Sequence, residues 1–322
     1  MSAEAADGGA APLHIVTPLI ESRALSLRTG HEVWLKMEAM QPPGSFKLRG
    51  VGLACQTHAQ RGATRFVSSS GGNAGIAVAY AGRKLGLPVD VVVPETTSAR
   101  ARELIALQGA RLTVHGASWQ EANELAQGML GPTDAFIHPF DDPLLWSGHA
   151  TLVDEVAQSA PASGFVPDAV VLAVGGGGLL CGVVQGLQRN GWGHVPVLAA
   201  ETHGADSLAQ SVAAGQRITL PAITSIATSL GARQVCAQAF EATRQHPVLS
   251  AVVSDAQAVQ ACRQFLDDHR TLVEPACGAA LAALDQLPAL LPALLPARLP
   301  QASRILVVVC GGVTATAASI LG

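Results

Sequence analysis

The chain has 322 residues, of which 49% are apolar and 14% charged, so it can bury a large core and does not have the composition of a disordered protein. Its net charge of -4 gives no electrostatic basis for binding nucleic acid or an anionic membrane. No apolar run reaches the length of a membrane span. Residues 1–11 lack the basic and apolar parts of a signal peptide, so we expect an unstructured leader there.

Six cysteines lie far apart without a Cys-x-x-Cys pair, which argues against a zinc site. Most of them fall in apolar runs, where a buried, reduced thiol is the ordinary state. This pattern favours a cytoplasmic protein.

Strand and helix patterns alternate along the chain, which predicts an α/β fold with parallel sheets. In the first half we expect strands at 32–36, 65–69, 89–93, 111–115 and 135–138, and helices at 73–85, 98–108 and 119–130. In the second half we expect strands at 168–174, 197–201 and 304–310, and helices at 147–159, 179–190, 206–214, 255–268 and 276–287. Prolines recur every four residues over 288–300, which predicts a surface connection because a helix interior does not tolerate them.

Lys47 lies in the run Pro-Gly-Ser-Phe-Lys-Leu-Arg-Gly at 43–50, a tight turn that leads into a helix. A solvated surface charge is the ordinary role of a lysine. A lysine held by a tight backbone can instead form a Schiff base with a cofactor and later act as a base.

Two glycine-rich segments stand just before predicted helices. The run Ser-Ser-Gly-Gly-Asn-Ala-Gly at 69–75 can direct backbone N–H groups at an anion, although an ordinary turn has a similar composition. The four glycines at 175–178 follow a strand, as in a phosphate cradle. Packing glycines, or a dinucleotide site supported by Glu201, are the alternatives for that run. Cys310, after an apolar run, is either a core thiol or a weak polar partner for a ligand.

These segments resemble the fold-type II pyridoxal 5'-phosphate (PLP) enzymes, and most closely the serine/threonine dehydratase family, over nearly the whole chain after about residue 12. The resemblance implies that Lys47 bonds to the cofactor, Phe46 packs on one face of its ring and Asn73 meets its ring hydroxyl. It places the phosphate at Gly175, Gly176, Gly177, Gly178 and Leu179, and the ring nitrogen at Cys310. It places the substrate carboxylate at Ser70, Gly71, Gly72, Asn73 and Ala74.

The resemblance also implies two αβα domains like those of the tryptophan synthase β subunit. The large domain would combine 1–39 with 143–322, the small domain would span 40–142, and the protein would be a homodimer. The implied reaction is β-elimination of L-serine to pyruvate and ammonia, and of L-threonine to 2-oxobutanoate, with Lys47 taking the Cα proton. Since no regulatory domain is evident after the last core strand, we expect a catabolic enzyme.

Position 71 bears on the reaction type. Related serine racemases carry a serine there as the acid or base opposite the lysine, and a glycine cannot transfer a proton. We therefore expect Lys47 to act with Ser70 and Gly71 in elimination without racemisation, although Ser70 keeps a hydroxyl nearby. Serine racemisation, β-replacement and a non-catalytic PLP-binding protein remain the alternatives.

The resemblance further implies a cation, K+ or a divalent ion, at Glu201, Ala205 and Ser207, with carbonyl groups of Leu230 and Ala232 as further candidates. His138 and His149 flank Pro-Phe-Asp-Asp-Pro and could suggest a metal site. In the family this segment is instead the structural crossover between the domains.

Overall fold

The structure is a computed structural model that describes residues 11–287, 289–290 and 303–322. The expected leader at 1–11, apart from its last residue, and most of the proline-rich stretch at 288–300 lie outside these residues.

Strands and helices alternate along the described chain. The strands are β1 (Leu19–Glu21), β2 (Glu32–Lys36), β3 (Arg65–Ser68), β4 (Val89–Val93), β5 (Arg111–Val114), β6 (Asp134–Phe136), β7 (Ala169–Ala173), β8 (Val197–Thr202), β9 (Val248–Val253) and β10 (Arg304–Val308). The helices are α1 (Arg23–Thr29), α2 (Lys47–Gln60), α3 (Asn73–Leu85), α4 (Ala99–Leu107), α5 (Trp119–Gly128), α6 (Pro143–Ser163), α7 (Gly178–Arg189), α8 (Ser207–Ala214), α9 (Ala237–Gln245), α10 (Asp255–His269), α11 (Pro275–Ala283) and α13 (Ala317–Leu321), with short 3-10 turns η1 (Glu38–Met40), η2 (Thr228–Leu230) and η3 (Leu284–Gln286).

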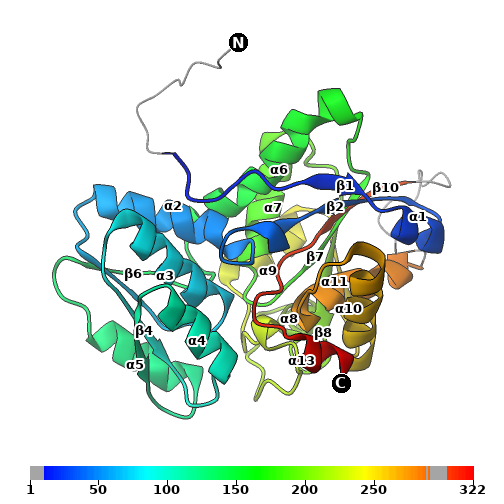
Figure 1. The fold of residues 1–322 in the computed structure, drawn as a ribbon. Helices are drawn as coiled ribbons and strands as arrows, with labels where there is room; N and C mark the ends of the chain where they lie inside the picture. Colours follow the sequence, from blue (N-terminus) through cyan, green and yellow to red (C-terminus); the bar gives the residue numbers. More distant parts are fainter. Residues whose placement is uncertain (1–10, 288, 291–302) are drawn as a thin grey trace.

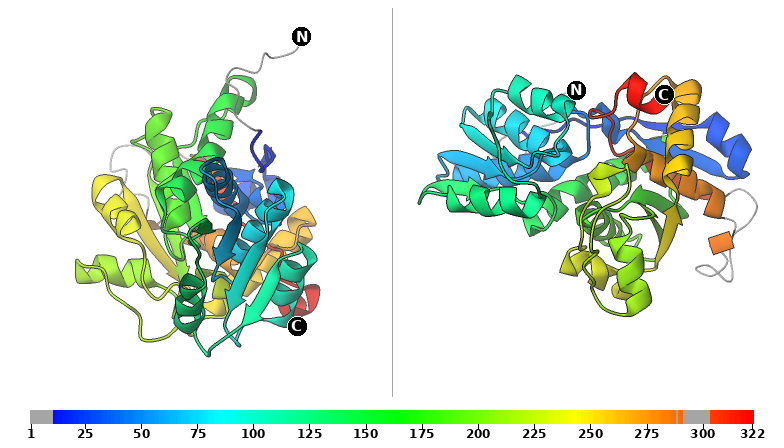
Figure 2. Two further views of the ribbon diagram at one scale, coloured as in Figure 1. Left: turned by 90° about the vertical axis from the view of Figure 1, so that its left-hand side faces the viewer. Right: turned by 90° about the horizontal axis from the view of Figure 1, so that it is seen from below.

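The strands form two separate sheets, which confirms the predicted α/β class (Figure 1). The larger sheet has the order β1-β2-β10-β7-β8-β9, and the smaller has the order β5-β4-β3-β6. All neighbours are parallel except the pair β1 and β2. The small sheet and its helices lie to one side of the large sheet, as the view from below also shows (Figure 2). The domain boundaries at 39/40 and 142/143 stay a prediction.

Helices cover both faces of the small sheet because successive strand residues point to opposite sides. Phe66 and Val91 pack in one apolar cluster with residues of α2 and α3. Val67 and Val92 pack in another with Ala122 and Ala126 of α5. In the large sheet every residue of β7 is buried, as expected for a central parallel strand.

The predicted elements match closely in the interior and less well at the edges. Helix α3 and strands β2 and β4 have the predicted bounds. The sequence analysis missed β1 and β9, which are the two edge strands of the large sheet, and the short helices α1, α9 and α13. Strand β10 ends at Val308, so Cys310 lies two residues beyond the strand, not at its last position.

Three helices cross at small residues beneath the predicted active-site turn. A Cβ atom placed on Gly148 of α6 would lie 2.4 Å from the carbonyl oxygen of Arg49 and 2.6 Å from the Cα of Gly50, both in α2. A Cβ on Gly182 of α7 would lie 2.4 Å from the Cβ of His149. Helices α2, α6 and α7 can therefore approach this closely only because these positions lack side chains.

We predict that Gly148→Ala lowers the free energy of unfolding by about 1–3 kcal/mol, since an added methyl overpacks the crossing. Gly128→Ala in α5 is the matched control, because a Cβ there meets no atom within 4 Å. That control should be stabilised by about 0.5–1 kcal/mol through helix propensity. Urea unfolding monitored by circular dichroism measures both, and equal effects of the two substitutions would contradict the predicted crossing.

Candidate functional site

The turn before Lys47 is paired with the segment around Cys310. The N–H of Phe46 donates to the carbonyl oxygen of Cys310 (3.0 Å), and the N–H of Gly312 donates to that of Gly44 (3.2 Å). Gly44 has a φ of +83°, which favours glycine, and a Cβ there would lie 2.4 Å from the Cβ of Val313. The first turn of α2 is thus fixed beside residues that follow β10.

The amine of Lys47 lies in a desolvated position. It donates a hydrogen bond to the carbonyl oxygen of Pro139 (2.6 Å) and lies 5.2 Å from the ring centroid of Phe46. Burial lowers the pKa of this amine to about 8, although the negative charge of Glu274 acts in the opposite direction. A lysine with this pKa has a substantial neutral fraction near physiological pH, as a nucleophile or base requires.

The sequence has only two other lysines, Lys36 and Lys84. Lys84 is exposed on α3. Lys36 is buried and donates to the carbonyl oxygen of Thr17 and to the carboxylate of Glu155. Lys47 is therefore the one lysine of the chain that stands beside both the Cys310 segment and the loops of the small sheet.

A buried ion network fixes the helix that carries Lys47. The guanidinium of Arg49, with no exposed side-chain surface, donates to Glu38 (Nε–Oε2, 2.7 Å) and to Glu155 (Nη1–Oε1, 2.7 Å). Lys36 also pairs with Glu155, so two cations balance two carboxylates. Burial would raise the pKa of Glu155, but Arg49 and Lys36 hold it below its ordinary value. The network joins β2, η1, α2 and α6.

The loop 69–75 leads into α3, whose first-turn N–H groups have no partner within the helix. Gly72 is the N-cap, and a Cβ on Gly75 would lie 1.9 Å from the carbonyl oxygen of Ser70. The hydroxyl of Ser69 donates to Asn123 (2.8 Å), which anchors the start of the loop to α5. The arrangement can receive an anion at the helix N-terminus.

The glycines at 175–178 lead into α7, which begins at Gly178 after the N-cap Gly177 with its φ of +95°. They are also tightly packed. A Cβ on Gly176 would lie 2.2 Å from the ring of Phe140, and one on Gly177 would lie 2.3 Å from the Cβ of Ala239. Packing therefore requires glycine here in its own right, and the N-terminus of the 12-residue helix α7 adds the capacity to bind a phosphate.

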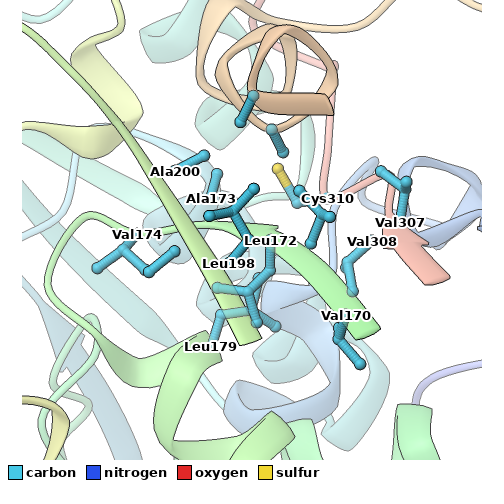
Figure 3. Packing of buried hydrophobic residues seen from close by; sticks show 14 of the residues in the cluster. Val170, Leu172, Ala173, Val174, Leu179, Leu198, Ala200, Val307, Val308 and Cys310 are labelled. Carbon is cyan, nitrogen blue, oxygen red and sulfur yellow. The ribbon is translucent and has the colours of Figure 1, made fainter. Parts of the chain in front are cut away.

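Cys310 is buried in the apolar cluster that includes residues of β7, β8 and β10 (Figure 3). The neighbouring thiol of Cys277 and burial raise the pKa of Cys310 well above its ordinary value. The thiol is therefore neutral and can offer a ring nitrogen only a weak polar contact.

The sequence analysis missed two further residues of the candidate site, Glu274 and Thr314. Asn73 Nδ2 donates to Glu274 Oε1 (2.6 Å), and Thr314 Oγ1 donates to Glu274 Oε2 (2.6 Å). Glu274 stands at the N-cap of α11, just before Pro275. A carboxylate before a helix is an ordinary capping residue, so nothing local in the sequence marked it as part of a site.

The residues expected to bind a cation are buried near the end of β8. Glu201 accepts hydrogen bonds from the N–H groups of Leu208 (2.9 Å) and Ala209 (2.8 Å), and burial raises its pKa to about 8. The hydroxyl of Ser207 is buried without a hydrogen-bond partner among the described residues. A buried carboxylate beside an unpaired hydroxyl suits a hard cation.

His138 and His149 make contacts with the backbone and with an aromatic ring. Nδ1 of His138 accepts hydrogen bonds from the N–H groups of Phe140 (3.2 Å) and Asp141 (2.7 Å). His149 is fully buried, with its ring centroid 4.8 Å from that of Phe46. Within the described chain, no cluster of three or more His, Cys, Asp or Glu residues could hold a metal ion.

A family model described as "Pyridoxal-phosphate dependent enzyme" matches residues 10–311. The chain belongs to this family. It is similar to the L-serine dehydratase/L-threonine deaminase of Homo sapiens, with 48% identity over 94% of this chain and 92% of that protein. Among solved structures it is similar to an L-serine ammonia-lyase from Rhizomucor miehei (TM-score 0.88, 37% identity, 96% of this chain and 98% of that one) and to maize serine racemase (0.83, 27%, 96% and 91%).

The described residues fit PLP. Lys47 supplies an amine for the aldehyde, and the starts of α3 and α7 supply two anion sites. The Oδ1 atom of Asn73 is buried without a partner among the described residues, so it is left for a ligand. Cys310, with its neutral thiol, is the group from the large sheet that could contact the ring nitrogen.

We predict that Glu155→Gln lowers the free energy of unfolding by about 3–5 kcal/mol at pH 7, because it leaves a buried cation unpaired. The pKa of Glu155 is lowered in the fold, so its contribution is present above its unfolded pKa and is lost as pH falls through the folded one. The difference in unfolding free energy between Glu155→Gln and the wild type should therefore become smaller as the pH is lowered.

Asp154→Asn is the matched control, since it breaks the neighbouring but more exposed pair with Arg189. It should cost about 0–1 kcal/mol. Denaturant unfolding from pH 7 down to pH 4 measures both variants, and a loss in Glu155→Gln no larger than in the control would contradict the role of the network.

Proposed function

We propose that the protein is a PLP-dependent L-serine ammonia-lyase that converts L-serine to pyruvate and ammonia and also accepts L-threonine. The observation that carries the proposal is the desolvated amine of Lys47, held between the Cys310 segment and the loops of the small sheet. The names of the human and fungal relatives support the substrate class.

When bound, PLP supplies the electron sink that stabilises negative charge at the substrate Cα. We propose that the neutral amine of Lys47 takes the Cα proton, since its lowered pKa gives far more free base near neutral pH than an ordinary lysine has. Residues 70–74 hold the substrate carboxylate at the start of α3, which fixes the Cα–H bond relative to Lys47. Phe46, the start of α7 and Cys310 would hold the cofactor.

Racemisation is the second candidate function, because maize serine racemase has a similar fold. Gly71 disfavours it, since no hydroxyl stands at that position to return a proton from the second face. The structure adds a steric reason. A Cβ on Gly71 would lie 2.5 Å from Oγ1 and 2.7 Å from Cγ2 of Thr97, so Thr97 occupies the space that a serine side chain would need.

We also propose that Glu201, Ala205 and Ser207 bind K+ or a divalent cation, with carbonyl groups of Leu230 and Ala232 as further candidate ligands. The buried carboxyl of Glu201 and the unpaired Ser207 hydroxyl support this site. The carbonyl oxygen of Leu230 already accepts a hydrogen bond from the N–H of Ala232 (2.8 Å), so it is the weaker candidate ligand.

We further propose a cytoplasmic homodimer. Over the part of the chain that the structure describes, no helix is long and apolar enough to cross a membrane. Ile15, Val16 and Met40 are exposed. The side-chain amide of Gln41, the residue after Met40, forms two hydrogen bonds with the backbone of Ile15. This fixed apolar patch supports an interface with a second copy.

We predict that Lys47→Ala lowers the rate of pyruvate formation by more than about 10⁴-fold, because both the bond to PLP and the base are lost. It should also abolish the visible absorbance band of the bound cofactor. Lys84→Ala, at an exposed lysine, is the control and should match the wild type. A Lys47→Ala variant with a tenth of wild-type turnover would refute the proposed function.

We predict that Gly71→Ser combined with Thr97→Ala gains D-serine formation, whereas Gly71→Ser alone gains less because Thr97 obstructs the new side chain. Chiral chromatography of serine recovered from the reaction measures this. Thr97→Ala alone is the control. Wild-type D-serine formation comparable with pyruvate formation would show that Gly71 does not select elimination.

We predict that K+ raises the melting temperature relative to tetramethylammonium at equal ionic strength, since a bound ion stabilises the folded state. Because the pKa of Glu201 is raised, its ionised form costs stability as pH rises toward 8, and the benefit of K+ should grow over that range. Glu201→Gln should remove the K+ effect, and exposed Glu241→Gln should keep it. A wild-type response to Mg2+ alone would favour a divalent ion.

A further inference from the structure

Glu274 is a buried carboxyl that the mechanism above does not use. Its exposed fraction is 4%, and it lies at the start of α11 beneath the segment that follows β10. Its N–H donates to the carbonyl oxygen of Gly311 (3.3 Å), next to Cys310. A Cβ on Gly311 would lie 3.5 Å from Glu274 Oε1, so the carboxyl reaches up to that backbone.

The carboxyl joins the two halves of the site. Asn73, the first residue of α3, donates to one oxygen, and Thr314, in the loop after β10, donates to the other (2.6 Å each). Asn73 Nδ2 also lies 3.4 Å from the hydroxyl of Ser229. One side chain from the large sheet therefore holds a residue of the small sheet and a residue of the C-terminal loop.

This contact fixes which way the amide of Asn73 faces. An ionised carboxylate can only accept hydrogen bonds, so the amide must turn its NH₂ group toward Glu274. Oδ1 is then the amide atom left for a ligand, and it has no other partner among the described residues.

The carboxyl also acts on Lys47. Burial raises the pKa of Glu274, while hydrogen bonds from Thr314, Asn73 and Ser229 and the charge of Lys47 act against burial. In return, burial lowers the pKa of Lys47, and the negative charge of Glu274 acts against that effect. Besides burial and the Cys277 thiol, the charge of Glu274 also contributes to the raised pKa values of Cys262 and Cys310.

We propose that Glu274 is a positioning residue of the PLP site: its carboxylate orients the Asn73 amide and the Thr314 hydroxyl and supplies the negative charge that faces Lys47. The inference rests on the proposed function, because it assigns Asn73 and Lys47 to PLP. It goes beyond that function by placing an acidic group at the end of the site where Cys310 alone was expected.

Replacing Glu274 distinguishes a structural role from a positioning role. A structural role predicts a less stable apoprotein, whereas a positioning role predicts no loss of stability. Since the pKa of Glu274 is raised in the fold, its ionised form costs folding free energy above its unfolded pKa. Replacing it with an uncharged side chain of the same shape should therefore leave the apoprotein equally stable or more stable. A loss of cofactor affinity without a loss of stability would identify a residue kept for the site.

The test compares Glu274→Gln with Glu274→Asp and Thr314→Val. PLP affinity is measured by absorbance titration of the apoprotein, and the rate of PLP uptake is measured as a function of pH. In Glu274→Gln we expect affinity to fall about 10-fold, because hydrogen bonds to a charged acceptor are lost. The midpoint of the uptake profile should move to lower pH, since Lys47 loses the charge that raises its pKa.

The other variants separate charge from contact. Thr314→Val removes one donor but keeps the charge, so its uptake midpoint should stay above that of Glu274→Gln. Glu274→Asp should restore the midpoint toward the wild-type value. The melting temperature of the Glu274→Gln apoprotein should stay within about 3 °C of the wild type or rise.

Three outcomes would overturn the inference. One is wild-type affinity and midpoint in Glu274→Gln. Another is a loss of affinity that accompanies a large fall in melting temperature, which would indicate a structural role. The third is failure of the wild type to bind PLP, or a visible band that survives in Lys47→Ala, and this outcome refutes the proposed function as well. A wild type that loses its band in Lys47→Ala but is unaffected by Glu274→Gln refutes the inference alone.

Discussion

The ion network around Arg49 is the constraint on which the geometry of the site depends. Arg49 stands two residues after Lys47 in the first turn of α2, so whatever fixes its guanidinium also fixes the direction of the helix that carries the amine. Glu38 and Glu155 hold it from two directions with almost no access to water. Buried charges of this kind are costly unless every partner is present, which makes the arrangement strict in geometry as well as in charge.

The close crossing of α2 with α6 complements the network. Gly50 directly follows Arg49, and together with Gly148 it lets the backbones of α2 and α6 come close. Close packing and ion pairing therefore act on the same turn of α2. A helix positioned by both has little freedom to rotate. This is the order that a catalytic lysine requires, since an error of about 1 Å in its position is costly in rate.

The proposed site is assembled from segments of the two sheets. The small sheet contributes the loop before α3, and the large sheet contributes the start of α7, Cys310 and Glu274. Burial is the main cause of the altered titration in this region: it lowers the pKa of Lys47 and raises that of Glu274. The polar groups that remain are mostly backbone N–H groups and neutral side chains. In the proposed function, such surroundings would leave the stabilisation of negative charge to the cofactor, while the protein would control orientation and proton transfer.

The sequence by itself determined the α/β class, most interior strands and helices, and the family, because alternating apolar runs and glycine-rich turns are local patterns. It also singled out Lys47, since its turn has a distinctive composition. Only the tertiary structure decided which groups meet that lysine. The edge strands β1 and β9 were missed because they are less buried and their pattern is weaker. Glu274 was missed because it meets Asn73, about 200 residues earlier in the chain, only after the two sheets have come together. Thr97 and Gly71 likewise lie in different loops. Contacts of this kind depend on packing between distant segments, and no local pattern of residues encodes them.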